Sequence, residues 1–245
     1  MGKTLNIAHR GFSGIYPENT MLAFRKAVEE GADGIETDVQ MTVDGVLVIC
    51  HDEKVDRTTD KKGFISKYRY DELSKLDAGI KFGEDYAGER IPTLDEFLDY
   101  VKDKNILINL ELKNSIIPYE GLEKGTIDKI YEYGLEKNVI ISSFNHYSMV
   151  KVKELDSNMK TGLLCAATIY NAGKYVKGVG ADALHPFFPS VMDYKKVEEI
   201  RSQKLMINTY TVNEEKYMRE LIKLNVDGII TNYPDKLKRI LREEK

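Results

Sequence analysis

Two strand-like segments of this 245-residue chain each carry charged side chains spaced two residues apart. Glu36 and Asp38 lie in GIETDVQM, and Glu111 and Lys113 lie in ILINLELK. Residues i and i+2 of a β-strand project from the same face, so each pair points to one side and its apolar neighbours point to the other. Charges among apolar residues need compensation, and a divalent cation would supply it for three carboxylates. The spacing therefore predicts a metal site.

The donor atoms indicate which kind of cation this site would take. Glu36, Asp38 and Glu111 offer only oxygen, which favours a hard cation, Mg²⁺ or Ca²⁺, over zinc. A bound divalent cation would leave these carboxylates with one net negative charge, and Arg10 and Lys113 would turn that balance to one net positive charge. A site of this charge suits one anionic phosphodiester.

Two of the four histidines lie at the ends of strand patterns. His9 ends the first pattern beside Arg10, and His51 ends the short pattern 46–51 beside Asp52. A single histidine at a strand end is usually a hydrogen-bonded structural residue, but two beside a carboxylate cluster favour an acid and a base near physiological pH. Asp52 is expected to orient His51 or its loop. A metal, two cationic side chains and two imidazoles together indicate phosphoryl transfer.

Three further side chains near strand ends have expected roles. Asn19, in PENT, is expected to be the N-cap of the first helix, and Glu18 to lie close enough to support the metal site. His185, in ALHP at the end of a later strand pattern, is a candidate for lining a substrate pocket.

Strand and helix patterns alternate almost from end to end. Strands are expected near 4–9, 34–41, 106–113, 139–144, 160–166, 182–186, 206–212 and 228–232, and helices near 20–30, 94–102, 119–134, 146–156, 169–177, 193–203, 214–223 and 235–243. Eight βα units in a chain of this length predict an α/β fold with a closed parallel sheet, a (β/α)8 TIM barrel. An open doubly wound sheet is the alternative, but the first βα turn lacks the G-x-G-x-x-G pattern.

Residues 53–90 interrupt this alternation. They are polar, rich in Asp, Lys and Tyr, and show no long period. A connection this long is usually a functional insertion, so we expect a small module over one mouth of the barrel. The whole chain, 1–245, is otherwise expected to be a single barrel domain.

Composition excludes several other classes of protein. Apolar residues make up 42% of the chain and charged residues 31%, as in ordinary globular proteins, and the net charge of −4 argues against a nucleic-acid partner. No apolar run reaches the length of a membrane span or of a signal peptide's apolar region. Cys50 and Cys165 lie in apolar stretches and are expected to be buried thiols. These features predict a cytoplasmic monomer or homodimer without stable membrane insertion.

At the level of motifs, the sequence resembles the bacterial glycerophosphodiester phosphodiesterases. The resemblance rests on AHRG (8–11), PENT (17–20), GADGIETDVQMTVDGVLVICHD (31–52), DRTT (56–59), IPTLDEFL (91–98), LELK (110–113), SSFN (142–145), TVN (211–213) and DGIITNYPD (227–235). It implies a TIM barrel with a small insertion after the HD motif. It also implies a metal on Glu36, Asp38 and Glu111, acid–base catalysis by His9 and His51, and phosphate binding by Arg10 and Lys113.

The chain departs from the family pattern at two positions. Family members commonly carry Trp before TVN and Asp after the late Gly-Ile-x-Thr, whereas this chain has Tyr210 and Asn232. Tyr210 still offers an aromatic wall for the glycerol or the leaving group, so altered affinity is expected rather than lost activity. What replaces the charge at Asn232 is left open by the sequence.

The leading hypothesis is hydrolysis of glycerophosphodiesters to sn-glycerol 3-phosphate and an alcohol, by way of a cyclic phosphate. A lysophospholipase-D-like activity is a second reading, but it needs an apolar groove, and residues 53–90 are polar. A non-catalytic protein that binds a phosphate ligand is a third. The presence of both histidines and all three carboxylates favours an enzyme.

Overall fold

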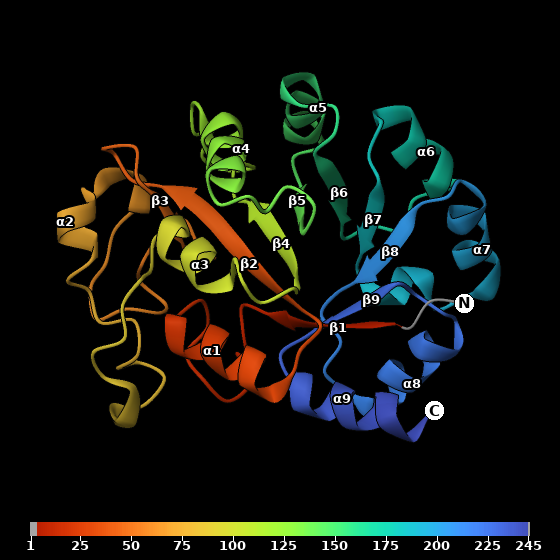
Figure 1. Cartoon of the computed structure of the whole chain (residues 1–245), viewed down its shortest axis with the longest axis horizontal. Coiled ribbons are helices and arrows are strands. Elements are labelled where there is room, and N and C mark those ends of the chain that lie inside the picture. Colours follow the sequence, from red (N-terminus) through yellow and green to blue (C-terminus); the bar gives the residue numbers. More distant parts are fainter. Residues whose placement is uncertain (1–3, 245) are drawn as a thin grey trace.

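Eight parallel strands close into a barrel in the computed structural model, which describes residues 4–244 (Figure 1). Each strand pairs with the next in the order β1, β2, β4, β5, β6, β7, β8, β9, and β1 pairs with both β2 and β9. The strands are β1 (Leu5–His9), β2 (Gly34–Met41), β4 (Leu107–Leu112), β5 (Val139–Ser143), β6 (Lys160–Cys165), β7 (Ala183–Pro186), β8 (Met206–Thr209) and β9 (Gly228–Thr231). The predicted TIM barrel is confirmed, and the open sheet is excluded because β9 returns to β1.

Helices surround the barrel and bury their apolar faces against the outward side chains of the strands (Figure 1). Outward residues of successive strands, such as Ile35, Ile108 and Ile141, join this core, while the intervening residues point into the barrel. The helices are α1 (Met21–Glu30), α3 (Leu94–Val101), α4 (Leu122–Glu132), α5 (His146–Leu155), α6 (Ala172–Val179), α7 (Tyr194–Ser202), α8 (Glu215–Lys223) and α9 (Pro234–Glu243).

Local signals explain where the helices begin. The Thr93 side chain accepts a hydrogen bond from the Glu96 N–H, and the Glu96 carboxylate accepts one from the Thr93 N–H, so a capping box starts α3. We expected α4 and α6 to begin three residues earlier than they do. Gly121 (φ 84°) and Asn171 (φ 53°) precede them in the left-handed region, which a right-handed helix cannot include.

Strand β8 is also shorter than its pattern predicts. It ends at Thr209 rather than at residue 212, and Tyr210 makes only an isolated bridge with Phe187. Tyr210 therefore belongs to the loop at the carboxyl end of β8, where barrel enzymes place residues of the active site.

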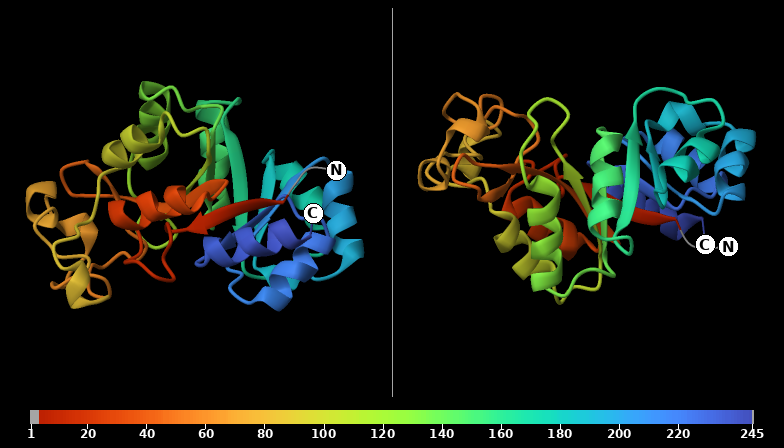
Figure 2. Two further views of the ribbon diagram at one scale, coloured as in Figure 1. Left: turned by 60° about the horizontal axis from the view of Figure 1, so that its bottom comes forward. Right: turned by 90° about the horizontal axis from the view of Figure 1, so that it is seen from above.

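The insertion 53–90 projects from one end of the molecule in the ribbon views of Figure 1 and Figure 2. It follows β3 (Leu47–Ile49), which pairs antiparallel with β2, and it contains the short helices η1 (Ile65–Lys67), α2 (Tyr70–Leu73) and η2 (Glu84–Tyr86). The insertion and its flanks bury a core of their own, made of Val48, Cys50, Val55, Ile65, Leu73, Leu76, Ala78 and Ile91. This small core lets a polar segment hold a fixed shape.

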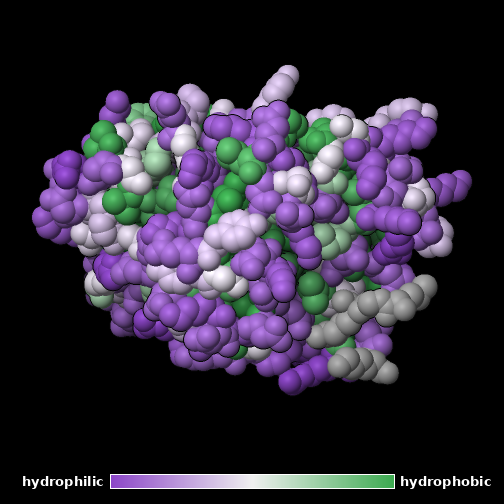
Figure 3. Space-filling model, turned by 45° about the horizontal axis from the view of Figure 1, so that its top comes forward, coloured by the Kyte–Doolittle hydropathy of each residue, from purple (hydrophilic) through white to green (hydrophobic). Residues whose placement is uncertain are grey.

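Cys50 and Cys165 are buried free thiols, as expected. Within residues 4–244, every helix is too short or too polar to cross a lipid bilayer. The face shown in Figure 3 is mostly hydrophilic, and its apolar residues form small separate patches. Scattered apolar residues of this kind are normal on a folded domain.

Candidate active site

The three predicted carboxylates lie together inside the barrel, near the carboxyl ends of β2 and β4. One oxygen from each of Glu36, Asp38 and Glu111 lies within 4.8 Å of the others, and all three residues are buried. Strand register causes this meeting, because Asp38 lies opposite Glu111 in the β2–β4 pair and His9 lies opposite Glu36 in the β1–β2 pair. The period-two spacing therefore placed the cluster correctly.

The electrostatics of this cluster fit a cation. Burial raises the pKa of Glu36 well above its usual value, and the neighbouring carboxylates of Asp38 and Glu111 raise it further. Burial and Asp38 also raise the pKa of Glu111. Burial acts in the same direction on Asp38, but Arg10 and Lys113 outweigh it and lower the pKa of Asp38 to about 2. The buried Oδ1 of Asp38 has no hydrogen-bond partner, so this oxygen is available to a hard cation.

The two cationic side chains border the cluster. Arg10 Nε lies 3.4 Å from Asp38 Oδ2, and the backbone N–H of Arg10 donates to Glu36 Oε2 at 3.2 Å. Lys113 Nζ donates to Glu111 Oε1 at 2.8 Å and lies 3.8 Å from Asp38 Oδ1. Both cations can therefore meet an anion that binds beside the carboxylates.

The histidines His9 and His51 line one cavity with two of the carboxylates, Glu36 and Glu111. The cavity has a volume of about 160 Å³ and is lined by His9, Arg10, Glu36, His51, Asn109, Glu111, Phe144, Leu164, Tyr210, Thr211 and Ile230. His51 Nδ1 is 2.6 Å from Asp52 Oδ1, which agrees with the expected orienting role of Asp52. Burial and the charge of Arg10 lower the pKa of His9 to about 4, so its imidazole is neutral at physiological pH.

Asn232 holds the ring of His9. Its Oδ1 lies 2.6 Å from His9 Nδ1, and because an amide oxygen only accepts, Nδ1 carries the proton and Nε2 is unprotonated. His9 Nε2 is 3.8 Å from Glu36 Oε2. The amide thus orients the His9 ring without adding a charge beside it.

The structure corrects the expected role of Asn19. The N-cap of α1 is Thr20, whose side chain accepts from the Ala23 N–H. Asn19 has a left-handed backbone (φ 57°), and its Nδ2 donates to Asp38 Oδ2 at 2.8 Å while its Oδ1 accepts from Thr37. Asn19 therefore orients a carboxylate of the cluster instead of capping a helix.

His185 does not line the cavity, which corrects the expectation for it. Its side chain is fully buried in the barrel, its Nε2 lies 3.1 Å from Asn208 Nδ2, and its ring packs on Gly162, where a Cβ would come within 2.7 Å. Its burial lowers its pKa to about 3. It is a residue of the barrel interior, and a strand-end position in sequence did not reveal its depth.

Other cavity residues were missed by the sequence reasoning. Asn109 lies two residues before Glu111 on β4, so the same period-two rule could have found it, and neither atom of its buried amide has a hydrogen-bond partner. Phe144 stands against Tyr210 with ring centroids 5.9 Å apart. Tyr210 lines the cavity as the expected aromatic wall, and its hydroxyl has no hydrogen-bond partner.

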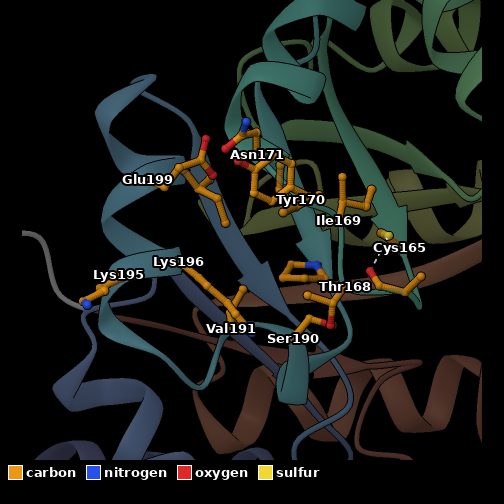
Figure 4. Close-up of a pocket in the computed structure, with 15 residues that line it drawn as sticks. Cys165, Thr168, Ile169, Tyr170, Asn171, Ser190, Val191, Lys195, Lys196 and Glu199 are labelled. Atoms are coloured by element: carbon orange, nitrogen blue, oxygen red, sulfur yellow. Dashed lines mark hydrogen bonds between the residues drawn. The ribbon is translucent and has the colours of Figure 1, made fainter.

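A larger cavity, of about 330 Å³, lies on the other side of the barrel wall (Figure 4). Leu164 lines the first cavity, whereas its neighbour Cys165 lines this one together with Ile169 and Val191. Its lining is mostly apolar, and its carboxylate, from Glu199, already accepts from the Gly173 N–H. The smaller cavity, where acids, bases and cations converge, is therefore the candidate active site.

Comparison with known proteins decides the family. The sequence profile of the Glycerophosphoryl diester phosphodiesterase family matches residues 9–236. The chain belongs to this family. It is similar to the glycerophosphodiester phosphodiesterase of Caldanaerobacter subterraneus subsp. tengcongensis, with 47% identity over 241 residues that cover 98% of this chain and 99% of the relative. The enzyme of the same name from Bacillus altitudinis is 40% identical over 240 residues, which cover 97% of this chain and 98% of that one.

A solved structure of a phosphodiesterase shares the fold of this chain. The phosphodiesterase of Oleispira antarctica, in complex with its product sn-glycerol-3-phosphate, superimposes with a TM-score of 0.86 at 33% identity and covers 96% of each chain. These matches confirm the resemblance seen in the motifs and the expectation of a phosphodiesterase.

Proposed function

We propose that this member of the glycerophosphodiester phosphodiesterase family hydrolyses glycerophosphodiesters to sn-glycerol 3-phosphate and an alcohol, with one divalent cation, Mg²⁺ or Ca²⁺. The observation that carries the proposal is a cluster of three buried carboxylates, two of which, Glu36 and Glu111, line one cavity together with His9 and His51. The product bound to the Oleispira antarctica enzyme supports the choice of substrate. The monomeric or homodimeric state and the cytoplasmic location stay predictions.

The charged residues of the site have proposed roles. Glu36, Asp38 and Glu111 would hold the cation, which when bound would polarise a phosphate oxygen. Arg10 and Lys113 would bind the remaining non-bridging oxygens and stabilise the charge that develops on them. Arg10 Nε lies 3.4 Å from Asp38 Oδ2 and Lys113 Nζ lies 3.8 Å from Asp38 Oδ1, which supports phosphate binding beside the proposed metal ligands.

The histidines His9 and His51 would divide the proton transfers. His9 presents an unprotonated Nε2 at physiological pH, which suits a general base. His51 would then protonate the departing alcohol, because its Nδ1 is already occupied by Asp52 and its Nε2 is left for the substrate. The two roles would reverse when water opens the cyclic phosphate.

The 2-hydroxyl of the glycerol would be the nucleophile of the first step. It lies next to the phosphate, so holding it in line uses proximity, for which effective molarities reach ~10⁵ M or more. His9 would remove its proton, and the bond from phosphorus to the leaving alcohol would break as the cyclic phosphate forms. The limited set of bases in the cavity supports this route over a separately activated water.

A substrate without the 2-hydroxyl is predicted to bind but to turn over at least ~10²-fold more slowly, because it lacks the nucleophile rather than a binding contact. The measurement compares kcat and KM for glycerophosphocholine and its 2-deoxy analogue. Product analysis by phosphorus NMR on the same samples tests the proposed activity, since sn-glycerol 3-phosphate is expected and phosphocholine is not. An unchanged kcat for the analogue would replace the cyclic route by direct attack of water.

Replacement Asn232→Asp is predicted to raise the pKa of His9 by about one unit or more, because a carboxylate beside Nδ1 stabilises the charged imidazole. The imidazole must be neutral to act as a base. As the pH is lowered, this variant would therefore begin to lose activity at a higher pH than the wild type. The acid limb of kcat/KM against pH measures the shift. An acid limb at the same pH in both proteins would show that Asn232 does not tune His9.

A further inference from the structure

One guanidinium from the insertion joins two carboxylates beside the cavity. Arg57 Nη1 and Nη2 donate to the two oxygens of Glu18, each at 2.7 Å. Its Nε and Nη2 donate to the two oxygens of Asp52, at 2.8 and 3.1 Å. Only an arginine side chain has enough donors in a fixed plane to bind two carboxylates in this way.

Each of these carboxylates in turn holds a residue of the proposed site. Glu18 Oε1 accepts from Arg10 Nη1 at 2.9 Å, and Asp52 Oδ1 lies 2.6 Å from His51 Nδ1. Arg57 is therefore one hydrogen-bonded partner away from both the proposed phosphate-binding arginine and the proposed leaving-group acid, although it does not line the cavity itself.

Both carboxylates are kept ionised by these contacts. Burial would raise the pKa of Asp52, but the hydrogen bonds from Arg57 and His51 outweigh it and lower the pKa to about 2. Glu18 follows the same pattern, since Arg57 and Arg10 overcome its burial and lower its pKa. An ionised carboxylate accepts hydrogen bonds on both oxygens, so it can bind Arg57 and its site residue at once.

The insertion also contacts the loop before α1 at residues other than Arg57. The Tyr86 hydroxyl donates to the backbone oxygen of Ile15 at 3.2 Å, and the rings of Tyr86 and Tyr16 meet edge to face with centroids 6.1 Å apart. The loop between β1 and α1, which carries Glu18, is thus attached to the insertion at more than one point.

We propose that Arg57 is a positioning residue for the reaction and that it acts through two separate sets of contacts. We name these the His51 arm, which runs through Asp52, and the Arg10 arm, which runs through Glu18. Through Asp52 it holds the His51 imidazole so that Nε2 faces the leaving oxygen. Through Glu18 it holds the Arg10 guanidinium for the phosphate. The insertion would in this way contribute to catalysis without touching the substrate, and the inference rests on the roles proposed above for His51 and Arg10.

The two arms predict different dependences on the leaving group. An alcohol such as choline leaves only if an acid protonates its oxygen, whereas 4-nitrophenolate leaves without a proton. A defect in the His51 arm therefore disappears with a 4-nitrophenyl ester, and a defect in the Arg10 arm remains because both esters carry the same phosphate. A general loss of folding would lower both rates equally.

The test measures kcat/KM for glycerophosphocholine and for glycerol 3-(4-nitrophenyl phosphate) in the wild type, Arg57→Ala, Asp52→Asn and Glu18→Gln. Partners that orient metal-bound histidines are typically worth about 10- to 100-fold. On the same scale, we expect Arg57→Ala and Asp52→Asn each to lower kcat/KM for the choline ester at least about tenfold more than kcat/KM for the nitrophenyl ester. Glu18→Gln is expected to lose equally on both. Arg90→Ala is the matched control, because Arg90 lies at the end of the same insertion, is equally exposed at 47%, and binds the single carboxylate of Glu96.

Equal losses of Arg57→Ala on the two esters, or no loss on either, would overturn the inference. If Arg57→Ala does not fold, Arg57→Lys decides in its place, because lysine keeps the charge but cannot bridge two carboxylates with fixed geometry. A wild-type protein that turns over neither ester with added cation would overturn the proposed function itself. If the wild type turns over the esters but Arg57→Ala shows no greater loss of kcat/KM on the choline ester than on the nitrophenyl ester, only the role of Arg57 is overturned.

Discussion

Replacement of Asp38 or Glu36 by alanine is expected to abolish both turnover and metal binding while the fold survives. These side chains supply two of the three clustered carboxylates, and the remaining oxygens are too few to hold a hard cation. Calorimetric titration with Mg²⁺ and Ca²⁺, together with kcat for glycerophosphocholine, measures both losses. Glu123→Gln is a matched control, because Glu123 is also buried but is bonded to Ser148 and Lys151, outside the cavity.

The metal-free protein offers a second readout of the same cluster. The pKa of Glu36 is raised in the folded state, so the folded protein binds that proton more tightly than the unfolded chain does. Stability of the metal-free protein is then lost as the pH rises above the ordinary glutamate value, and Glu36→Gln is expected to restore it at neutral pH. A lower melting temperature for metal-free Glu36→Gln than for the metal-free wild type would contradict the mutual repulsion inferred here.

Replacement of either cavity histidine by alanine is expected to lower kcat by about 10²–10⁴-fold, the usual contribution of a positioned acid or base. His9 and His51 each hold one ring nitrogen in a fixed hydrogen bond and line the cavity, so their loss removes a proton carrier rather than a binding contact. The rate of the wild type should follow a bell-shaped pH profile, and each variant should lose one limb.

The leaving group identifies which histidine serves as acid. On glycerol 3-(4-nitrophenyl phosphate), His51→Ala should recover most of its loss and His9→Ala should not. His146→Ala is a suitable control, since His146 hydrogen-bonds Tyr175 and the Leu164 backbone and does not line the cavity. Near wild-type kcat in both His9→Ala and His51→Ala would remove acid–base catalysis by these residues from the account.

Local periodicity made much of the barrel and the metal cluster predictable. Alternating strand and helix patterns give the order of elements, and the two-residue spacing of Glu36 and Asp38 fixes the face on which they lie. Helix starts were less predictable, because a left-handed residue such as Asn171 delays the start of a helix without any change in the apolar pattern. The sequence pattern does not show how deep a side chain lies inside the barrel. His185 and His9 therefore look alike in sequence, although only His9 lines the cavity.

Roles that depend on contacts between distant segments could not be read from the sequence. Asn19 bonds to Asp38 only because the β1–α1 loop folds back over β2, and Asn232 meets His9 only because β9 closes the barrel against β1. Arg57 follows the same rule, since its partner Glu18 lies 39 residues away in the chain. The insertion shows no period that would have predicted its path.

The most direct test of the central claim is turnover of glycerophosphocholine after exhaustive chelation and again after addition of Mg²⁺ or Ca²⁺, with the metal content of each sample measured. The cluster of Glu36, Asp38 and Glu111 predicts that metal-free protein is inactive, that one added cation per chain restores the rate, and that Asp38→Ala is not restored. Full activity in a sample shown to contain no divalent metal would contradict the account.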